Sequence, residues 1–300
     1  MRQAERKIPI RHVLGALLLA LGSSACQVPD HHLIHPAAAP PEILTWTEDV
    51  RQGRLAIHLE GARPRGAGVF PAVIVHPEGG KTAVDMKGVI WDLARRGYVA
   101  VAADYKRRLD GRYRRNTFAW REDGDVTATL ERVMEYPFVD TARIATLGFS
   151  QGGIYSLLIA AHAPDRIRAV VAYYPVTDFE YWLYKDRPHP IRRFVYRMIR
   201  RHFRKESGAE TEEAFRRMLR RASVLPQAES IRAPVLLIHG DRDPAASIEE
   251  SARLVLRLRE LDRNVEFLVV PGGVHIFNFR QPELARMAWA ATLEWLRLHL

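Results

Sequence analysis

The chain has 300 residues, one cysteine and a net charge of +10, from 45 Lys and Arg against 35 Asp and Glu. This length suits one full α/β domain or at most two small domains, and an apolar share of 47% excludes an intrinsically disordered chain. The single cysteine excludes a disulfide framework and any zinc site built on several cysteines. Most of the positive charge lies in residues 1–25 and 185–221, so the rest of the chain is nearly neutral.

Residues 1–25 have the three parts of a secretory signal peptide. A basic start leads into a short apolar run, Val13–Leu21, and then into the small residues Gly22–Ala25. As a helix, such a run spans about 14 Å, which is too short to cross a bilayer. We therefore predict that residues 1–25 are removed on export and take no part in the fold.

Cys26 follows this segment directly and resembles the lipidated cysteine of bacterial lipoproteins. Such signals usually carry Leu three residues earlier, where this chain has Ser23, so an ordinary signal-peptidase cut is the alternative. The Pro- and Ala-rich residues 26–42 are predicted to form a tether. The expected location is the bacterial periplasm or cell envelope, with a lipid anchor at Cys26.

The pattern from residue 43 onward predicts strands that alternate with helices. Ile43–Val50 and Arg54–Glu60 partly alternate apolar and polar residues, as a hairpin does. Six later apolar runs suit strands buried on both faces of a parallel sheet, and helical segments separate them. We therefore predict one α/β domain over residues 43–300, with a mostly parallel sheet flanked by helices. The six runs are Ala72–His76, Tyr98–Ala103, Arg143–Gly148, Ala169–Tyr174, Pro234–His239 and Glu266–Val270, and the helices are Met86–Arg96, Asp125–Tyr136, Gly152–His162, Ile248–Leu261 and Pro282–Leu300.

Residues 179–223 contain no strand-like run and are predicted to form a helical lid inserted between two strands. Apolar residues and arginines share one helical pattern up to Arg204, and a second helix is expected after Ser207 or Thr211. A basic amphipathic face suits contact with anionic lipid, although a solvated face over a packed apolar stripe is the alternative. Nucleic acid is not expected as a partner of an exported protein. The aromatic residues that either line a pocket or form the core of the lid are Phe179, Tyr181, Trp182 and Tyr184.

The sequence Gly148-Phe149-Ser150-Gln151-Gly152 lies between a predicted strand and a predicted helix. A serine on a tight turn in this context projects its hydroxyl above the sheet edge, and small neighbours let the helix pack close to the strand. The alternative is an ordinary Gly-rich strand–helix turn. We predict that Ser150 is a catalytic nucleophile.

A serine hydroxyl needs a base to take its proton, and the base needs a carboxylate to orient it. Asp241 and Asp243 both follow the strand that ends at His239, and His275 follows the last strand. Strand ends on one edge of a parallel sheet are where active sites form. His275 is the predicted base. Asp243 is the preferred acid, because Asp241 comes directly after Gly240 and suits a role in shaping the turn.

The negative charge that develops on a substrate oxygen needs two N–H donors. The backbone N–H of Gln151, just after the nucleophile, is one candidate. The other is expected from the loop that begins at Pro77, which itself has no N–H, so Glu78 or Gly79 must supply it, and we favour Gly79. Tyr174, at the end of a predicted strand, is a possible substrate contact.

Residues 54–300 resemble the dienelactone hydrolase family and the catalytic domain of the prolyl oligopeptidase family, both within the α/β-hydrolase superfamily. The matching stretches are VIVHPEGG, ARRGYVAVAADY, VDTARIATLGFSQGG, PVLLIHGDRDP and PGGVH. The resemblance implies an α/β-hydrolase fold and hydrolysis of esters, lactones or short peptides. It also supports Asp243 as the acid, and it suggests that Glu78 stands where dienelactone hydrolases keep an active-site glutamate, with an exposed loop glutamate as the alternative.

Three departures narrow the expected substrate. Dienelactone hydrolases use a cysteine where this chain has Ser150, and they lack the insert of about 45 residues. Prolyl oligopeptidases carry a propeller domain ahead of the catalytic domain, which is not expected here. The sequence therefore favours a serine esterase for small acyl or lactone substrates, with a peptidase or amidase as the runner-up and a non-catalytic binding lipoprotein third. No cofactor and no metal site are expected.

Overall fold

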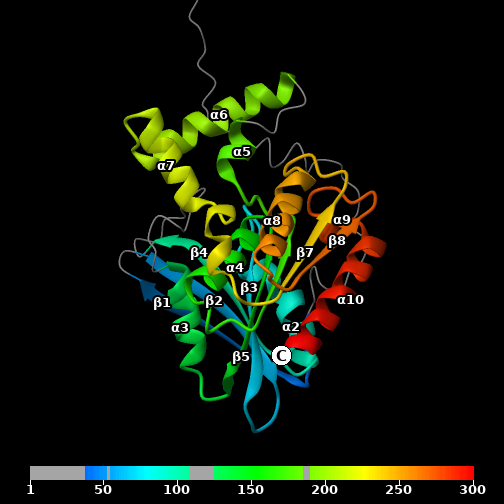
Figure 1. Ribbon diagram of the computed structural model, residues 1–300. Coiled ribbons are helices and arrows are strands. Elements are labelled where there is room, and N and C mark those ends of the chain that lie inside the picture. The colour runs from blue at the N-terminus through cyan, green and yellow to red at the C-terminus, as the bar shows by residue number, and fades with distance from the viewer. Residues whose placement is uncertain (1–37, 53–54, 109–124, 185–189) are drawn as a thin grey trace, which may run out of the picture.

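An eight-stranded sheet runs through the computed structural model, which describes residues 38–300 except 53–54, 109–124 and 185–189 (Figure 1). The predicted signal peptide and Cys26 lie outside the described residues. The strand order is β1-β2-β4-β3-β5-β6-β7-β8. β1 and β2 form an antiparallel hairpin and β2 runs antiparallel to β4, whereas every other neighbouring pair is parallel. The strands are β1 (Ile43–Gln52), β2 (Leu55–Pro64), β3 (Phe70–His76), β4 (Val99–Arg108), β5 (Val139–Phe149), β6 (Ala169–Tyr173), β7 (Val235–Gly240) and β8 (Val265–Val270).

Helices cover both faces of this sheet and bury a separate apolar core on each. Successive residues of one strand alternate between the cores, as in β3, where Ile74 faces one and Val75 the other. α3 (Asp125–Met134), α4 (Gln151–His162) and α8 (Ile248–Glu260) pack on the first face. α2 (Lys87–Arg95) and α10 (Pro282–His299) pack on the second. Both faces are therefore buried in the central strands, which explains their continuous apolar runs.

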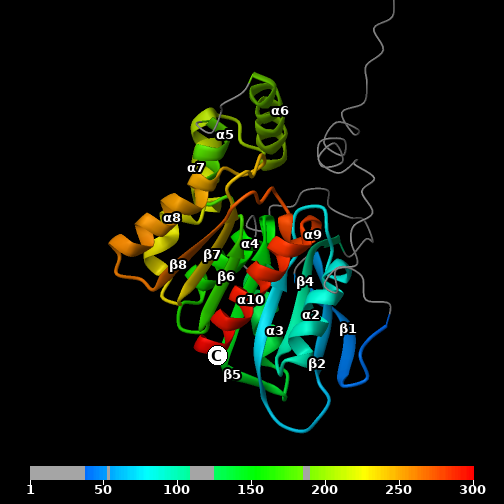
Figure 2. The same ribbon diagram turned by 90° about the vertical axis from the view of Figure 1, so that its right-hand side faces the viewer.

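The segment between β6 and β7 is helical, as predicted. α5 (Phe179–Tyr184), α6 (Pro190–Ser207) and α7 (Glu212–Ala222) stand at the end of the molecule opposite the C-terminus (Figure 2). Of the two starts considered for the second long helix, Thr211 is the one used, because its side chain accepts a hydrogen bond from the N–H of Ala214. The helical insert is joined to β7 through a short helix, η3 (Leu225–Ser230).

Two elements differ from the prediction. β8 was predicted as a strand buried on both faces, but it lies at the edge of the sheet and only Val270 is fully buried. A short helix after the last strand, α9 (Phe277–Arg280), was not predicted. In the described part of the chain, no helix is both long enough and apolar enough to cross a membrane.

Candidate active site

Ser150 occupies the sharp turn between β5 and α4. Its backbone has φ 51° and ψ −112°, a conformation that residues with a side chain rarely adopt. The N–H of Ser150 donates to the carbonyl of Tyr173 on the neighbouring strand β6, at 2.9 Å. Surrounding contacts therefore hold the strained turn in place, which is the usual condition for strain to persist.

The two glycines that flank Ser150 permit this turn sterically. A Cβ on Gly148 would come within 2.0 Å of the carbonyl oxygen of Gly152, and a Cβ on Gly152 would come within 2.0 Å of the carbonyl oxygen of His76. The start of α4 therefore lies directly against the end of β3. This contact brings the serine next to the loop that begins at Pro77.

Ser150, His275 and Asp243 form one hydrogen-bonded chain. Nε2 of His275 lies 3.0 Å from Oγ of Ser150, and Nδ1 of His275 lies 2.6 Å from Oδ2 of Asp243. A carboxylate accepts only, so Nδ1 carries the proton and Nε2 is free to accept from the serine hydroxyl. The structure thus brings together the three residues that the sequence singled out, although they follow three different strands.

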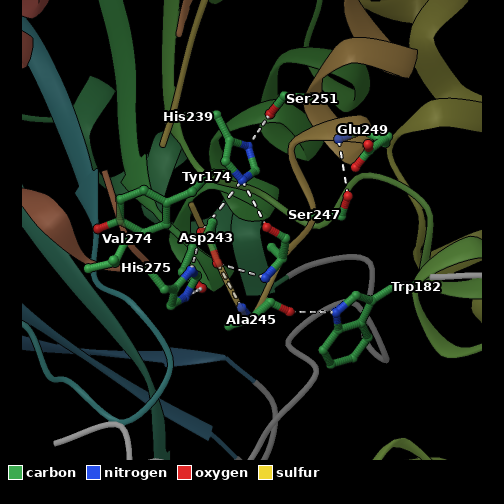
Figure 3. Close-up of polar contacts among 12 residues, drawn as sticks. Tyr174, Trp182, His239, Asp243, Ala245, Ser247, Glu249, Ser251, Val274 and His275 are labelled. Atoms are coloured by element: carbon green, nitrogen blue, oxygen red, sulfur yellow. Dashed lines mark hydrogen bonds and ion pairs between the residues drawn. The ribbon is translucent and has the colours of Figure 1, made fainter. Parts of the chain in front are cut away.

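Asp243 is held as a buried carboxylate. Its side chain is 0% exposed, and Oδ1 accepts hydrogen bonds from the N–H groups of Ala245 and Ala246 at 2.8 and 2.9 Å (Figure 3). Burial alone raises the pKa of Asp243, but hydrogen bonds from His239 and His275 outweigh it and lower the pKa well below its usual range. Asp241 instead faces the loop that carries His275 (the base loop, residues 271–276). There its carboxylate accepts the N–H of Gly272 at 2.7 Å.

His239 is a second histidine at the same carboxylate, and the sequence analysis did not select it. It is fully buried, and its Nε2 lies 3.1 Å from the carbonyl of Ala246 and 3.5 Å from Oδ2 of Asp243. Its Nδ1 lies 2.7 Å from Oγ of Ser251 on α8. A histidine at the end of a buried strand, just before the acidic turn, was the available signal.

The loops that carry Asp243 and His275 are in direct contact. Gly240 and Gly273 approach so closely that a Cβ on Gly240 would lie 2.1 Å from the carbonyl oxygen of Gly273. The same carbonyl accepts the N–H of Arg242 at 3.0 Å. Gln281, at the start of α10, braces the base loop from the other side by accepting the N–H of Val274 and donating to the carbonyl of Gly272.

Tyr174 packs against the catalytic candidate His275 and is completely buried. Their ring centroids are 4.8 Å apart in an edge-to-face arrangement, and the hydroxyl donates to Oδ1 of Asn278. Burial, followed by the negative charge of Glu78, raises the pKa of Tyr174. The direct contacts of Tyr174 are therefore with the imidazole and α9, which supports the position of the histidine ring.

The loop after β3 lies beside the nucleophile turn. Gly79 is adjacent to Gln151, since a Cβ on Gly79 would lie 3.3 Å from Oε1 of that side chain. Glu78 is only 5% exposed, so it is not the exposed loop residue of the alternative reading. Both residues of the predicted pair of N–H donors thus lie at the same end of the sheet as Ser150.

Two aromatic residues at the start of the helical insert, Phe179 and Trp182, pack inward. Phe179 is buried, and Trp182 packs against the same core while contacting Tyr196 edge to face at 5.4 Å. This arrangement matches the reading of these two residues as core of the insert. Among the described residues, no group of three or more His, Cys, Asp and Glu side chains is arranged to hold a metal ion.

Comparison with known proteins relates this geometry to two kinds of hydrolase. A family model described as the prolyl oligopeptidase family matches residues 83–300. An uncharacterized peptidase (YtmA) of Bacillus subtilis (strain 168) is 27% identical over 238 residues, which is 79% of this chain and 86% of the relative. A protein of Bradyrhizobium sp described as "Probable 2-oxo-3-(5-oxofuran-2-ylidene)propanoate lactonase" is 27% identical over 254 residues, which is 80% of this chain and 88% of the relative.

Solved structures agree on the fold. The acylaminoacyl peptidase of Pyrococcus horikoshii gives a TM-score of 0.70 at 18% identity, over 86% of this chain and 42% of that chain. A dienelactone hydrolase-like promiscuous phosphotriesterase from metagenomic libraries gives a TM-score of 0.62 at 18% identity, over 86% of this chain and 99% of that chain. This chain therefore spans about two fifths of the first protein and nearly all of the second. The α/β-hydrolase fold and the predicted resemblance to both families are confirmed.

Proposed function

This chain belongs to the prolyl oligopeptidase family, and we propose that it is a serine hydrolase that cleaves ester or lactone bonds of small substrates. The observation that carries the proposal is the continuous path from Ser150 through His275 to Asp243, with heavy-atom distances of 3.0 and 2.6 Å. This path supplies a hydroxyl, a base and a buried carboxylate in the arrangement that nucleophilic catalysis requires.

In the first half of the reaction, Oγ of Ser150 attacks the substrate carbonyl carbon while Nε2 of His275 takes the hydroxyl proton. The tetrahedral intermediate then breaks its bond to the leaving oxygen, which receives that proton from Nε2. The products of this step are an alcohol and an acyl group bound to Ser150; with a lactone, both stay in one molecule. Asp243 holds the imidazole in the required tautomer and stabilises the imidazolium that forms.

In the second half, water attacks the acyl carbon. Nε2 of His275 takes a proton from this water and returns it to Oγ of Ser150 as the acyl–oxygen bond breaks. A carboxylic acid leaves, and the hydroxyl is restored. The backbone N–H groups of Gln151 and Gly79 are the proposed donors to the oxyanion in both halves, a role for which their adjacency is the support.

The substrate class is inferred from relatives and from the site. A lactonase and a peptidase are equally similar to this chain, at 27% identity each. We favour esters and lactones because the sequence resemblance puts Glu78 where dienelactone hydrolases keep an active-site glutamate. Its burial beside the nucleophile turn suits a role in positioning the substrate. A serine peptidase or amidase acting on short peptides is the alternative, and a non-catalytic binding protein is third, since all three residues of the path are present.

Hydrolysis of p-nitrophenyl esters from acetate to octanoate tests the proposal, with full-length protein compared with Ser150→Ala. We expect the mutation to lower kcat/KM by at least about a thousandfold, in line with loss of a nucleophile. The preferred acyl length then measures the depth of the pocket. If wild type and Ser150→Ala are equally inert on every ester, esterase action is wrong, and labelling of Ser150 by a fluorophosphonate would separate a peptidase from a binding protein.

We also propose that the protein is exported to the bacterial periplasm or cell envelope, anchored through Cys26, with the helical insert acting as a lid that touches anionic lipid. The support in the insert is a line of exposed basic residues on α6, one turn apart: Arg197, Arg201 and Lys205. These three make no ion pair with a described residue, whereas Arg204 pairs with Glu212 at 3.2 Å. A basic helix face of this kind is attracted to anionic headgroups.

A further inference from the structure

The helical insert makes a hydrogen bond to the loop that holds Asp243 (the acid loop, residues 241–246). Nε1 of Trp182, on α5, donates to the carbonyl oxygen of Ala245 at 2.9 Å (Figure 3). From this contact we infer that Trp182 is a positioning residue for the acid Asp243, so that the insert is part of the catalytic geometry and not only a cover. The inference rests on the proposed function, because it assigns Trp182 to the reaction of that same site.

One peptide group connects Trp182 to the carboxylate. The carbonyl that Trp182 holds and the N–H of Ala246 belong to the same peptide unit, and that N–H donates to Oδ1 of Asp243 at 2.9 Å. A trans peptide is planar, and its C=O and N–H point in opposite directions. A donor fixed on the carbonyl side therefore fixes the direction of the N–H on the other side. Trp182 thus sets the orientation of a group that binds the catalytic acid.

His239 holds the same peptide chain from the core. Its Nε2 donates to the carbonyl of Ala246 at 3.1 Å, and Ala245 contributes its own N–H to Oδ1 of Asp243 at 2.8 Å. The acid loop therefore accepts hydrogen bonds from two sides, from the fully buried His239 and from the half-buried Trp182 of the insert. The histidine belongs to β7, so Trp182 supplies the shorter of the insert's own hydrogen bonds to this loop.

The insert is itself built to hold Trp182 in place. The indole packs edge to face on Tyr196 of α6 at 5.4 Å and against Phe203 at 6.4 Å. The hydroxyl of Tyr196 also points to the carbonyl of Ala245, at 3.4 Å, a longer and weaker contact than that of Trp182. A ring fixed by two neighbours donates in a defined direction, which a mobile surface side chain does not.

Trp182→Phe in the full-length protein tests the inference, because it keeps an aromatic ring and removes the N–H. Loss of one hydrogen bond to the acid loop lowers kcat by about fivefold to tenfold, with KM within about twofold of wild type. A second variant carries 3-benzothienylalanine at position 182, which keeps the two-ring shape without an N–H. It shows the same fall in kcat, which separates loss of the donor from loss of packing.

A spectroscopic measurement tests the position of Asp243 directly. The proton between Nδ1 of His275 and Asp243 gives a resonance far downfield of the amide protons, because the hydrogen bond is short and charge-assisted. In both Trp182 variants this resonance moves upfield or broadens. Tyr196→Phe, which removes only the 3.4 Å contact, changes it less.

Trp46→Phe is the matched control, since Trp46 lies on β1, at the opposite edge of the sheet from β7 and β8, and its indole donates to the hydroxyl of Tyr136 at 3.2 Å. It leaves both the kcat and the downfield resonance at wild-type values. The inference is overturned if the Trp182 variants fold, keep the wild-type kcat and keep the wild-type resonance, or if kcat falls in Trp182→Phe but not in the benzothienyl variant. Because the resonance does not depend on turnover, its shift would be seen even if Ser150→Ala showed that the proposed ester hydrolysis is wrong.

Discussion

Asp241 and Asp243 lie two residues apart on one turn, yet they make different contacts. Asp243 points into the protein, where it meets His275, His239 and two backbone N–H groups. Asp241 is exposed and joins the two loops through the N–H of Gly272. The pair therefore offers a test in which the same chemical change is made on an inward and an outward carboxylate.

We predict that Asp243→Asn lowers kcat by roughly 10³- to 10⁴-fold, because an amide no longer holds the imidazole in the tautomer that accepts from Ser150. Asp241→Asn keeps an acceptor for Gly272 and leaves kcat close to wild type. Steady-state kinetics on the best p-nitrophenyl ester measure both. Equal losses in the two variants would contradict the assignment of Asp243 as the acid.

At this scale the sequence predicts the residues whose roles follow from chain order. Ser150, the acidic turn and His275 each follow a strand of the parallel part of the sheet, which brings them to one edge. His239 and Trp182 follow no such rule. Their contacts with the acid loop depend on how β7, α8 and the insert pack. A histidine or tryptophan in an apolar pattern predicts a buried side chain, but not the residue to which it hydrogen-bonds.

At the scale of elements, a buried glutamate on α8 fixes the start of the insert. Oε2 of Glu250 accepts the N–H groups of Thr177 and Asp178 at 2.9 and 2.8 Å, just before α5 begins. Its other oxygen is buried without a hydrogen-bond partner among the described residues. Burial raises the pKa of Glu250 to about 8, even though these N–H groups oppose the shift.

We predict that Glu250→Gln stabilises the protein at alkaline pH. Because the pKa is raised from 4.5 to about 8 on folding, the stability that the protonated carboxyl contributes is fully present below about pH 4.5. It is lost as the pH rises to about 8. Glutamine stays neutral and keeps a carbonyl acceptor, so urea unfolding gives a free energy similar to wild type at pH 5 and about 2–4 kcal/mol higher at pH 9.

Glu249→Gln is the control for this measurement, because Glu249 is the exposed neighbour on the same first turn of α8. Its free energy of unfolding follows that of wild type at both pH values. If the free energy of unfolding of Glu250→Gln also follows that of wild type from pH 5 to pH 9, ionisation of Glu250 does not destabilise the folded protein, and the prediction is wrong.

The elements themselves were predictable where burial is complete. β3, β5, β6 and β7 lie within the sheet, and their continuous apolar runs mark them clearly. β8 has a similar run but lies at the edge, because strand order depends on crossovers between distant segments and not on the local sequence. α9, with only four residues, is too short to show a helical period.

At the scale of the whole molecule, charge is concentrated and partly neutralised. In α7, Arg216 and Arg220 pair with Glu180 of α5 at 2.5 and 3.0 Å, and Arg217 pairs with Glu213. These pairs tie the insert together and leave little net charge along that helix. The exposed line on α6, formed by Arg197, Arg201 and Lys205, is different, because no described residue forms an ion pair with it.

We predict that this line binds vesicles that contain anionic lipid. Cys26→Ser protein, which cannot be lipidated at that residue, sediments with vesicles containing phosphatidylserine more than with neutral ones. Changing Arg197, Arg201 and Lys205 together to Glu weakens this binding on the order of a hundredfold, at about 1 kcal/mol for each basic residue. The same variant retains wild-type hydrolysis of a soluble ester.

Both proteins in this comparison share the same N-terminus, so a difference between them belongs to α6. A control with Arg51, Arg259 and Arg286 changed to Glu alters the net charge equally at exposed positions elsewhere. Binding that falls as much in the control as in the α6 variant, or that ignores the anionic lipid content, would contradict contact through this face.

The position of His275, the proposed base, on the loop after the last strand also has a consequence for partly formed chains. Ser150 precedes His275 by 125 residues, and the loop of His275 is braced by Gln281 at the start of the final helix. A chain that ends at β7 already contains Ser150 but lacks His275, the proposed base. On the proposed mechanism, hydrolysis therefore arises only once the last strand and the final helix have joined the fold, and a chain cut short of them is inert toward esters.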